Sequence, residues 1–249
     1  MKFENLTFTN ETSRVSSNLR IDREKYVIIK VTFEISDNDV LNQLKNRARI
    51  LATNTNNGAA NSSKNRDNGT KYKDSLSGII AEHVCVETLN KTCKQEVAHY
   101  TDYTGSINQI DIKLINDETI EVRSSCIKNG VDFALFSKNK FNLNEQYLDV
   151  LGPYSNLYKP CEIGKNYYMR VIFYCDKNDF ITHLDSKEFA AYIVGGSTWS
   201  MMGDSNYYQD KNLIPEGSDI QTKTFYRVIP IGKALDAIQL LDIIKNSLE

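Results

Sequence analysis

The chain has few of the residues that form metal sites and disulfide frameworks through short motifs. It contains only three histidines and five cysteines, and no two cysteines are closer than eight positions apart. An odd number of scattered cysteines argues against a disulfide framework and against a zinc site. We therefore expect free thiols and a cytoplasmic location. The histidines also lack metal-like spacing, so each is expected to be a packed or solvated residue.

Long apolar segments are missing as well. No apolar run approaches the roughly 20 residues that a membrane-spanning helix needs, and the first residues lack the charged-then-apolar pattern of a signal peptide. We therefore expect no membrane partner. An excess of positive charge is also absent, because 30 Lys and Arg against 32 Asp and Glu give a formal net charge of −2. This balance does not exclude nucleic-acid binding, since basic groups can form local patches.

The composition suits one folded domain. Of the 249 residues, 41% are hydrophobic and 25% are charged, which is enough apolar surface for a core. Without a linker that divides the chain, we expect a single domain over residues 1–249. Residues 53–70 differ because they contain no large apolar side chain, so burial cannot offset the entropy of ordering them. We expect a mobile polar loop there, either a surface insertion or a loop that orders on DNA.

Hydrophobic periodicity predicts both helices and strands. Apolar residues at helical spacing predict helices over residues 36–51, 75–92 and 234–248. β-Branched and aromatic runs predict strands over residues 26–35, 100–115, 120–126, 132–136, 146–151, 167–175, 190–194 and 225–231. Tight turns are expected at residues 116–119 and 152–156. The frequent hairpins favour an α/β fold (α+β, mixed sheet) in which helices flank a central mixed β-sheet.

Acidic side chains converge in the hairpin predicted over residues 109–125. Side chains alternate along a strand, so Asp111 and Lys113 would share one face. Glu121 and Arg123 would likewise share one face of the returning strand. A short turn can bring Asp111 and Glu121 to the same end of the sheet, where two carboxylates suit a hard divalent cation such as Mg²⁺. Such a pair is also common on solvated hairpins, so a purely structural role stays open.

This segment resembles the PD-(D/E)xK nuclease superfamily, which includes many type II restriction endonucleases. The resemblance rests on a strand with Asp111, a short turn, and the hydrophobic-Glu-hydrophobic-basic run of residues 120–123 (IEVR). The preceding helix adds residues 77–82 (SGIIAE), which look like the family's helix motif ending in (Gly/Ala)-Glu. The motif-bearing similarity covers residues 75–125, and a looser similarity includes residues 191–199.

The resemblance implies a restriction endonuclease-like fold and a Mg²⁺-dependent endonuclease that hydrolyses phosphodiester bonds in double-stranded DNA. Mn²⁺ may substitute for Mg²⁺ in such enzymes. Asp111 and Glu121 would bind the ion, with assistance from Glu82 and from the backbone carbonyl of Val122. Arg123 would hold the scissile phosphate and stabilise the charge of the transition state. A symmetric DNA target would suggest a homodimer.

Arg123 departs from the family pattern, which has lysine at this position. Arginine keeps the positive charge but cannot lose a proton near neutral pH. Lys113 could supply an ammonium from a migrated position, or a metal ion alone could acidify water. Otherwise the protein would be a catalytically impaired DNA- or partner-binding protein on a nuclease-like fold. A third alternative is an interaction domain without a metal site.

A set of basic residues downstream of the motif, with tyrosines between them, could contact DNA phosphates. These candidates are Lys138, Lys140, Lys159, Lys165 and Arg170. An ordinary solvated surface has the same composition, so the sequence leaves both interpretations open.

Overall fold

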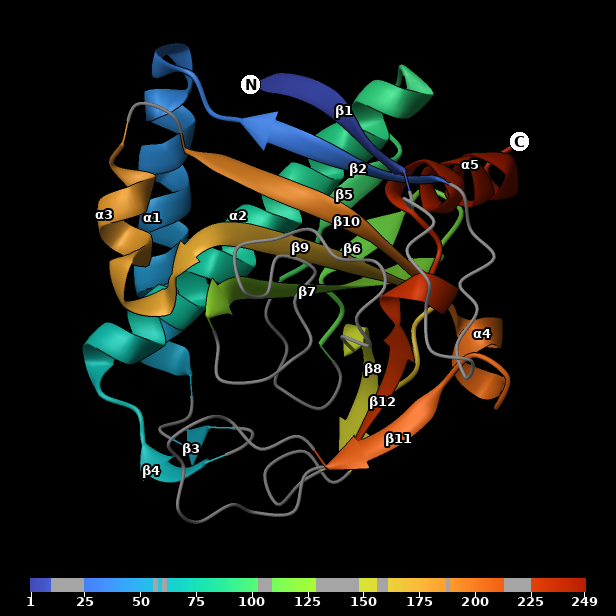
Figure 1. The fold of residues 1–249 in the computed structure, drawn as a ribbon. Coiled ribbons are helices and arrows are strands. Elements are labelled where there is room, and N and C mark those ends of the chain that lie inside the picture. The colour runs from blue at the N-terminus through green and yellow to red at the C-terminus, as the bar shows by residue number, and fades with distance from the viewer. Residues whose placement is uncertain are drawn as a thin grey trace.

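The computed structural model describes residues 1–9, 25–55, 58–59, 62–102, 109–128, 148–155, 161–186, 189–212 and 225–249. These residues form a seven-stranded mixed sheet with helices on one face and a small three-stranded sheet on the other (Figure 1). The predicted mixed sheet flanked by helices is therefore confirmed at this level. Within these ranges, no helix has the length and apolar character to cross a membrane. All five cysteines are free thiols.

The large sheet has the strand order β1-β2-β10-β9-β7-β6-β5. Its strands are β1 (Lys2–Thr9), β2 (Lys25–Thr32), β5 (Ala98–Tyr100), β6 (Ile112–Leu114), β7 (Thr119–Lys128), β9 (Tyr167–Asp176) and β10 (Ala190–Thr198). Neighbouring strands are antiparallel except β7 and β9, which run parallel with Glu121 opposite Tyr168. The parallel pair brings the residues that precede β9 next to the start of β7.

Two smaller sheets and several helices complete the fold. The three-stranded sheet has the order β11-β12-β8 and consists of β8 (Leu148–Ser155), β11 (Gln209–Asn212) and β12 (Phe225–Pro230). A separate two-stranded sheet consists of β3 (Gly58–Ala59) and β4 (Ser62–Asn65). The α-helices are α1 (Asn38–Asn54), α2 (Asn68–Cys93), α3 (Phe180–Leu184), α4 (Trp199–Gly203) and α5 (Ala237–Ser247). Short 3₁₀ helices are η1 (Ile35–Asp37), η3 (Lys177–Asp179) and η4 (Ile231–Lys233).

Strand β9 contributes to two hydrophobic cores because its side chains alternate between the faces of the sheet. Met169 and Val171 pack in the larger core with α1, α2, α3 and α5. Tyr168 packs in the smaller core with β8, β12 and α4. In the neighbouring strand, Val122 belongs to the larger core, so Glu121 is on the opposite face, beside Tyr168.

A glycine pair in β10 lets the chain that leads into α5 approach the sheet closely. The backbones of Gly196 and Leu235 exchange two hydrogen bonds of 2.9 Å. Gly195 has φ of 118°, and a Cβ on it would lie 2.1 Å from the Leu235 oxygen. Asp236 then caps α5 in a reciprocal capping box with Gln239. This close approach requires glycine at both positions.

The three predicted helices are confirmed as α1, α2 and α5, but their ends differ. Helix α1 begins at Asn38 instead of residue 36 and follows Asp37, whose carboxylate pairs with the chain's amino group at 2.8 Å. Helix α2 begins at Asn68 instead of residue 75, because Asp67 accepts a hydrogen bond of 2.6 Å from the backbone N–H of Thr70.

Some strand and loop predictions are wrong. A single strand over residues 100–115 does not form, because β5 and β6 are separate strands in this stretch. The turn predicted at residues 152–156 is replaced, up to residue 155, by the continuing strand β8. The polar stretch 53–70 contains the end of α1, the β3–β4 pair and the start of α2. The strand predicted at residues 132–136 lies outside the described residues.

Candidate active site

The β6–β7 hairpin forms as predicted, and it leaves part of one edge of β7 without a paired strand among the described residues. A side chain can lie there. Ile112 pairs with Ile120, and Lys113 pairs with Thr119. The turn closes through a hydrogen bond of 2.8 Å from the Leu114 N–H to the Glu118 carbonyl. In the described residues, β6 pairs with β7 only up to Ile120, while β7 continues along β9.

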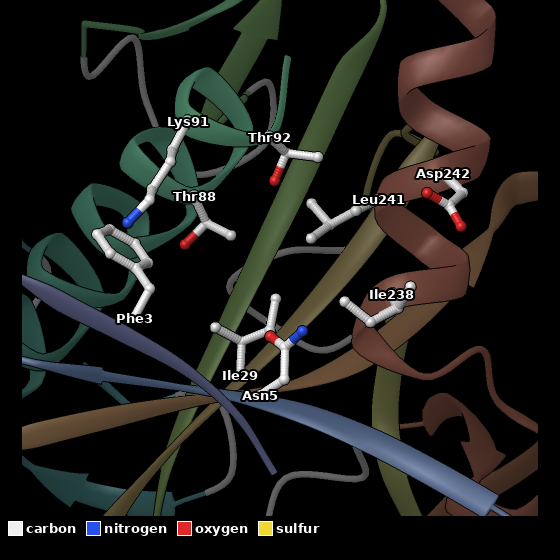
Figure 2. A pocket seen from close by; sticks show the side chains of 9 residues that line it. All are labelled: Phe3, Asn5, Ile29, Thr88, Lys91, Thr92, Ile238, Leu241 and Asp242. Atoms are coloured by element: carbon white, nitrogen blue, oxygen red, sulfur yellow. The ribbon is translucent and has the colours of Figure 1, made fainter. Parts of the chain in front are cut away.

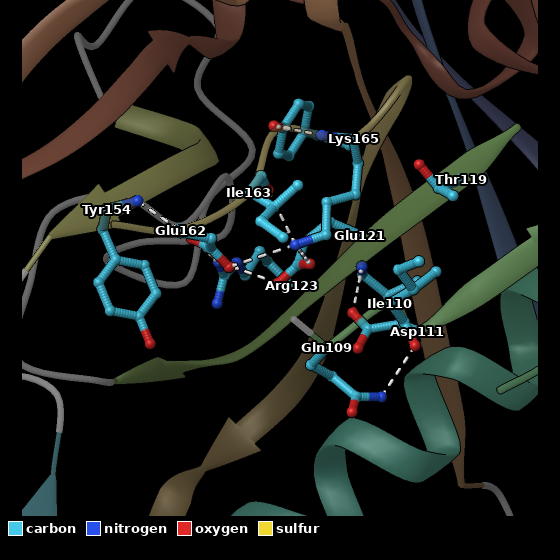
Figure 3. Close-up of polar contacts among 12 residues, drawn as sticks. Gln109, Ile110, Asp111, Thr119, Glu121, Arg123, Tyr154, Glu162, Ile163 and Lys165 are labelled. Atoms are coloured by element: carbon cyan, nitrogen blue, oxygen red, sulfur yellow. Dashed lines mark hydrogen bonds and ion pairs between the residues drawn. The ribbon is translucent and has the colours of Figure 1, made fainter. Parts of the chain in front are cut away.

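Asp111 fills the place where β6 and β7 separate. It precedes β6 by one residue, and its side chain is buried, with 9% of the residue exposed. Its Oδ2 accepts a hydrogen bond of 2.8 Å from the backbone N–H of Val122 (Figure 3). The carboxyl of Asp111 is thereby fixed beside the peptide that follows Glu121.

Glu121 extends from β7 into a buried group of charges. The residue is 4% exposed, and its Oε1 lies 2.9 Å from Nη2 of Arg123. Its Oε2 lies 3.2 Å from Nζ of Lys165 but forms no hydrogen bond within the described part of the chain. This buried oxygen therefore has a charged neighbour but no hydrogen-bond donor among the described residues.

Helix α2 supplies a third carboxyl, that of Glu82. Burial, together with the charge of Glu121, raises its pKa to about 7, against the opposing charge of Arg47. The pKa of Asp111 is raised well above its ordinary value by burial and then by Glu121 and Glu82. The three carboxyls thus interact unfavourably when ionised, although they come from three different elements of the fold. A positive charge among them would favour their ionised forms.

The carboxyls match Mg²⁺ in chemistry but do not form a closed ligand set. No group of three or more His, Cys, Asp or Glu side chains close enough to share an ion occurs in the described ranges. Mg²⁺ is usually held by one or two carboxylates, with waters and phosphate oxygens completing its shell. Asp111 and Glu121 are two carboxylates of the kind that this pattern uses. The proposed ligand role of the Val122 carbonyl stays a prediction.

Arg123 is not free to face a phosphate in this structure. Its Nη2 donates to both carboxylate oxygens of Glu162, at 2.7 Å each. Its guanidinium carbon also lies 4.9 Å from the ring centroid of Tyr154. Burial opposes the charge on Arg123, but Glu121 and Glu162 together raise its pKa well above the ordinary value. To hold a scissile phosphate, as the sequence suggests, Arg123 would have to leave Glu162.

Lys165 lies in the site and not on an exposed DNA-binding face. The residue is 2% exposed, and Nζ points to Glu121 while donating a hydrogen bond of 2.9 Å to the Ile163 carbonyl. Its backbone N–H donates to the hydroxyl of Tyr168 at 3.0 Å. Figure 3 shows Lys165 directed toward the same carboxylate as Arg123. The site therefore contains a lysine, although not at the position of the family motif.

Other predicted cations are not at the site. The side chain of Lys113 is 52% exposed and forms an ion pair of 2.6 Å with Asp117, so it does not supply the migrated ammonium. Arg170 is 1% exposed and cannot contribute to an exposed DNA-binding face. The DNA-contact predictions for three other lysines lie outside the described residues: Lys138, Lys140 and Lys159.

Sequence reasoning missed Glu162 and Arg47. The Glu162 side chain is 1% exposed and accepts a hydrogen bond of 3.0 Å from the Tyr154 N–H. The guanidinium of Arg47, on α1, lies 4.5 Å from the ring centroid of Tyr100 and acts electrostatically on Glu82. Neither residue belongs to the motif segment. The one sequence signal that could have connected Glu162 with the site is its position shortly before the strand predicted over residues 167–175.

A cavity of about 440 Å³ opens elsewhere, between β1, β2, α2 and α5 (Figure 2). On its rim, Nζ of Lys91 lies 4.0 Å from the ring centroid of Phe3. The cavity is lined by Phe3, Asn5, Ile29, Thr88, Lys91, Thr92, Ile238, Leu241 and Asp242. None of these residues belongs to the carboxyl group described above, so the cavity is separate from the candidate site.

Comparisons with known proteins do not identify a function. No family model matches the chain, and no solved structure gives a significant match. The chain is similar to an uncharacterised protein from Methanocaldococcus jannaschii, with 27% identity over 268 residues. The alignment covers 90% of this chain and 87% of that protein. The similarity therefore extends along nearly the whole of both chains without assigning an activity to either.

Proposed function

We propose that the protein is a Mg²⁺-dependent phosphodiesterase that cuts double-stranded DNA, as the resemblance to PD-(D/E)xK nucleases implies. One observation carries this proposal. The buried carboxyls of Asp111 and Glu121 and the half-buried carboxyl of Glu82 interact electrostatically with one another, and the ammonium of Lys165 lies 3.2 Å from Glu121. Carboxylates beside a lysine are the groups that a metal-dependent hydrolysis of a phosphodiester needs.

Each residue would have a distinct role. Asp111 and Glu121 would hold the ion, and Glu82 would assist from α2. When bound, Mg²⁺ would neutralise charge on the phosphate and lower the pKa of water. Nζ of Lys165 would turn from Glu121 toward a phosphate oxygen and stabilise the negative charge that develops there.

The proposal is tested by cleavage of supercoiled plasmid DNA in Mg²⁺, Mn²⁺ or EDTA. The wild-type protein should cut only with a metal ion. Glu121→Gln and Lys165→Met should each reduce the rate by about 100-fold or more, the scale of losing one transition-state contact. Lys113→Met is the matched control and should cut normally, because Lys113 is exposed and paired with Asp117. Full cleavage by a folded Glu121→Gln variant would refute the assignment.

A second candidate is a DNA- or partner-binding protein without catalysis. It is favoured by the pairing of Arg123 with Glu162 and by the lack of a three-ligand group in the described residues. This candidate predicts DNA retention in a gel shift but no cleavage with any metal ion. A plain interaction domain would bind neither Mg²⁺ nor Mn²⁺. The homodimer stays a prediction that sedimentation with a symmetric DNA duplex would test.

A further inference from the structure

Residues 161–166, here called the site segment, lead into β9 and carry Lys165. On one side the segment is anchored by Glu162, whose carboxylate accepts two hydrogen bonds of 2.7 Å from Arg123. The same carboxylate accepts a hydrogen bond of 3.0 Å from the backbone N–H of Tyr154, in β8. Charge-assisted bonds to a carboxylate that is 1% exposed make a strong and directional anchor.

The other side of the site segment is anchored by Trp199 and Asn166. The backbone N–H of Trp199 donates to the Asn166 carbonyl at 2.8 Å. The side-chain oxygen of Asn166 accepts a hydrogen bond of 2.9 Å from the N–H of Thr119, at the start of β7. A Cβ on Gly164 would lie 2.5 Å from carbons of the indole ring, so Trp199 packs directly on the segment.

Both anchors restrict where the ammonium of Lys165 can lie. A lysine side chain is a flexible four-carbon stem, and its position depends on its backbone and on the acceptors around Nζ. Here Nζ lies 3.2 Å from Glu121, 3.8 Å from Glu162 and 2.9 Å from the Ile163 carbonyl. Two of these three acceptors belong to the site segment itself.

We propose that Glu162 is a positioning residue of this site. Through Arg123 it holds the site segment against β7, and the segment in turn fixes the Lys165 ammonium at Glu121. This inference rests on the proposed function for the chemical meaning of Lys165, but the position of the segment can be measured without any cleavage. Under this proposal, Arg123 has a different role from the lysine of the family pattern, because its Nη2 contacts both Glu121 and Glu162.

Acrylamide quenching of Trp199 fluorescence measures the anchoring directly. Trp199 is the only tryptophan of the chain, is 49% exposed and packs on Gly164. If Glu162→Ala loosens the segment beneath the indole, quenching should rise, by at most about twofold, because full exposure would double the 49% that is now accessible. Lys165→Met retains the bonds between Glu162 and Arg123, so its quenching should equal that of the wild-type protein. Wild-type quenching in folded Glu162→Ala would overturn the inference.

A milder substitution covers the case in which Glu162→Ala does not fold. Glu162→Gln keeps the shape of the side chain and one oxygen acceptor but loses the charge that binds Arg123. Its quenching should lie between the values of the wild-type protein and of a fully exposed indole. An equal increase in Lys165→Met and Glu162→Gln would also overturn the inference, because the anchor would then depend on the ammonium.

A double-mutant cycle tests whether Glu162 acts through Lys165. Glu162→Gln should slow DNA cleavage in the wild-type background and have no further effect in Lys165→Met. An undiminished effect in the Lys165→Met background would contradict the positioning role. If the wild-type protein cuts no DNA at all, the proposed function fails, while the quenching experiment still decides whether Glu162 anchors the segment.

Discussion

Replacing Glu82 by glutamine should stabilise the metal-free protein at alkaline pH. Burial and the charge of Glu121 raise the pKa of Glu82 from 4.5 to about 7, against the opposing charge of Arg47. Between these pH values, the folded protein keeps a proton that the unfolded chain has released. The free energy of unfolding therefore falls as the pH rises from about 4.5 to above 7.

The size of the effect follows from the same two pKa values. The difference between 4.5 and about 7 corresponds to about 3 kcal/mol of unfolding free energy, at about 1.4 kcal/mol per pH unit. Glutamine has a similar shape but no charge, so the variant escapes the cost of ionising Glu82 in its buried place. At pH 5 the wild-type carboxyl is mostly protonated, and the variant should gain little.

Urea unfolding followed by circular dichroism at pH 5 and pH 8, with EDTA present, measures this difference. Glu82→Gln should exceed the wild-type protein by up to about 3 kcal/mol at pH 8 and by little at pH 5. Glu96→Gln is the control, because Glu96 is exposed after the end of α2 and its loss should change stability by less than about 0.5 kcal/mol. A gap that is equal at both pH values, or a variant less stable than wild type at pH 8, would refute the reasoning.

Four further predictions follow from individual residues. Asp111→Asn should also stabilise the metal-free protein above pH 7, because burial raises the pKa of Asp111. The same variant should abolish the rise in Tm that Mg²⁺ causes, and an undiminished rise would contradict the ligand role of Asp111. Burial lowers the pKa of His83 to about 4. In the folded protein His83 therefore stays unprotonated at pH values below about 6.5, where the unfolded chain gains a proton. The contribution of His83 to the unfolding free energy should therefore fall by about 3 kcal/mol from pH 7 to pH 4, opposite in sign to the contribution of Glu82, and in urea titrations His83→Gln should lack this contribution. Gly195→Ala should destabilise the protein by about 2–3 kcal/mol, because its Cβ meets a backbone oxygen at positive φ; an unchanged Tm would oppose this. Arg123→Lys should lower DNA cleavage, since lysine loses the paired bonds to Glu162, whereas a gain would indicate a decayed site.

Elements with strong local patterns could be predicted from the sequence. Helix α2, the β6–β7 hairpin and strand β9 each have a periodicity or turn that acts within a few residues, so tertiary packing only adjusts their ends. The break between β5 and β6 has no such pattern. The two strands instead pair antiparallel with each other, with Tyr100 opposite Ile112, a contact between segments that periodicity within one segment does not record.

The acidic residues of the candidate site could be predicted from the sequence, but its basic residues could not. Glu82, Asp111 and Glu121 belong to one short motif segment, and the fold brings their charges within reach of one another. Lys113 was misplaced because strict alternation of side chains fails where Asp111 bends out of β6. Lys165 reaches the site only because β9 pairs in parallel with β7, and the sequence does not specify that pairing.

The most direct test of the central claim is Mn²⁺ binding, measured by the electron paramagnetic resonance signal of the free ion. The wild-type protein, Glu121→Gln and Lys113→Met would be titrated without DNA. We predict a strong site in the wild-type protein and in Lys113→Met, and its loss in Glu121→Gln. An absence of Mn²⁺ binding by the wild-type protein, or equal binding by Glu121→Gln, would contradict the claim that these carboxylates hold a catalytic metal ion.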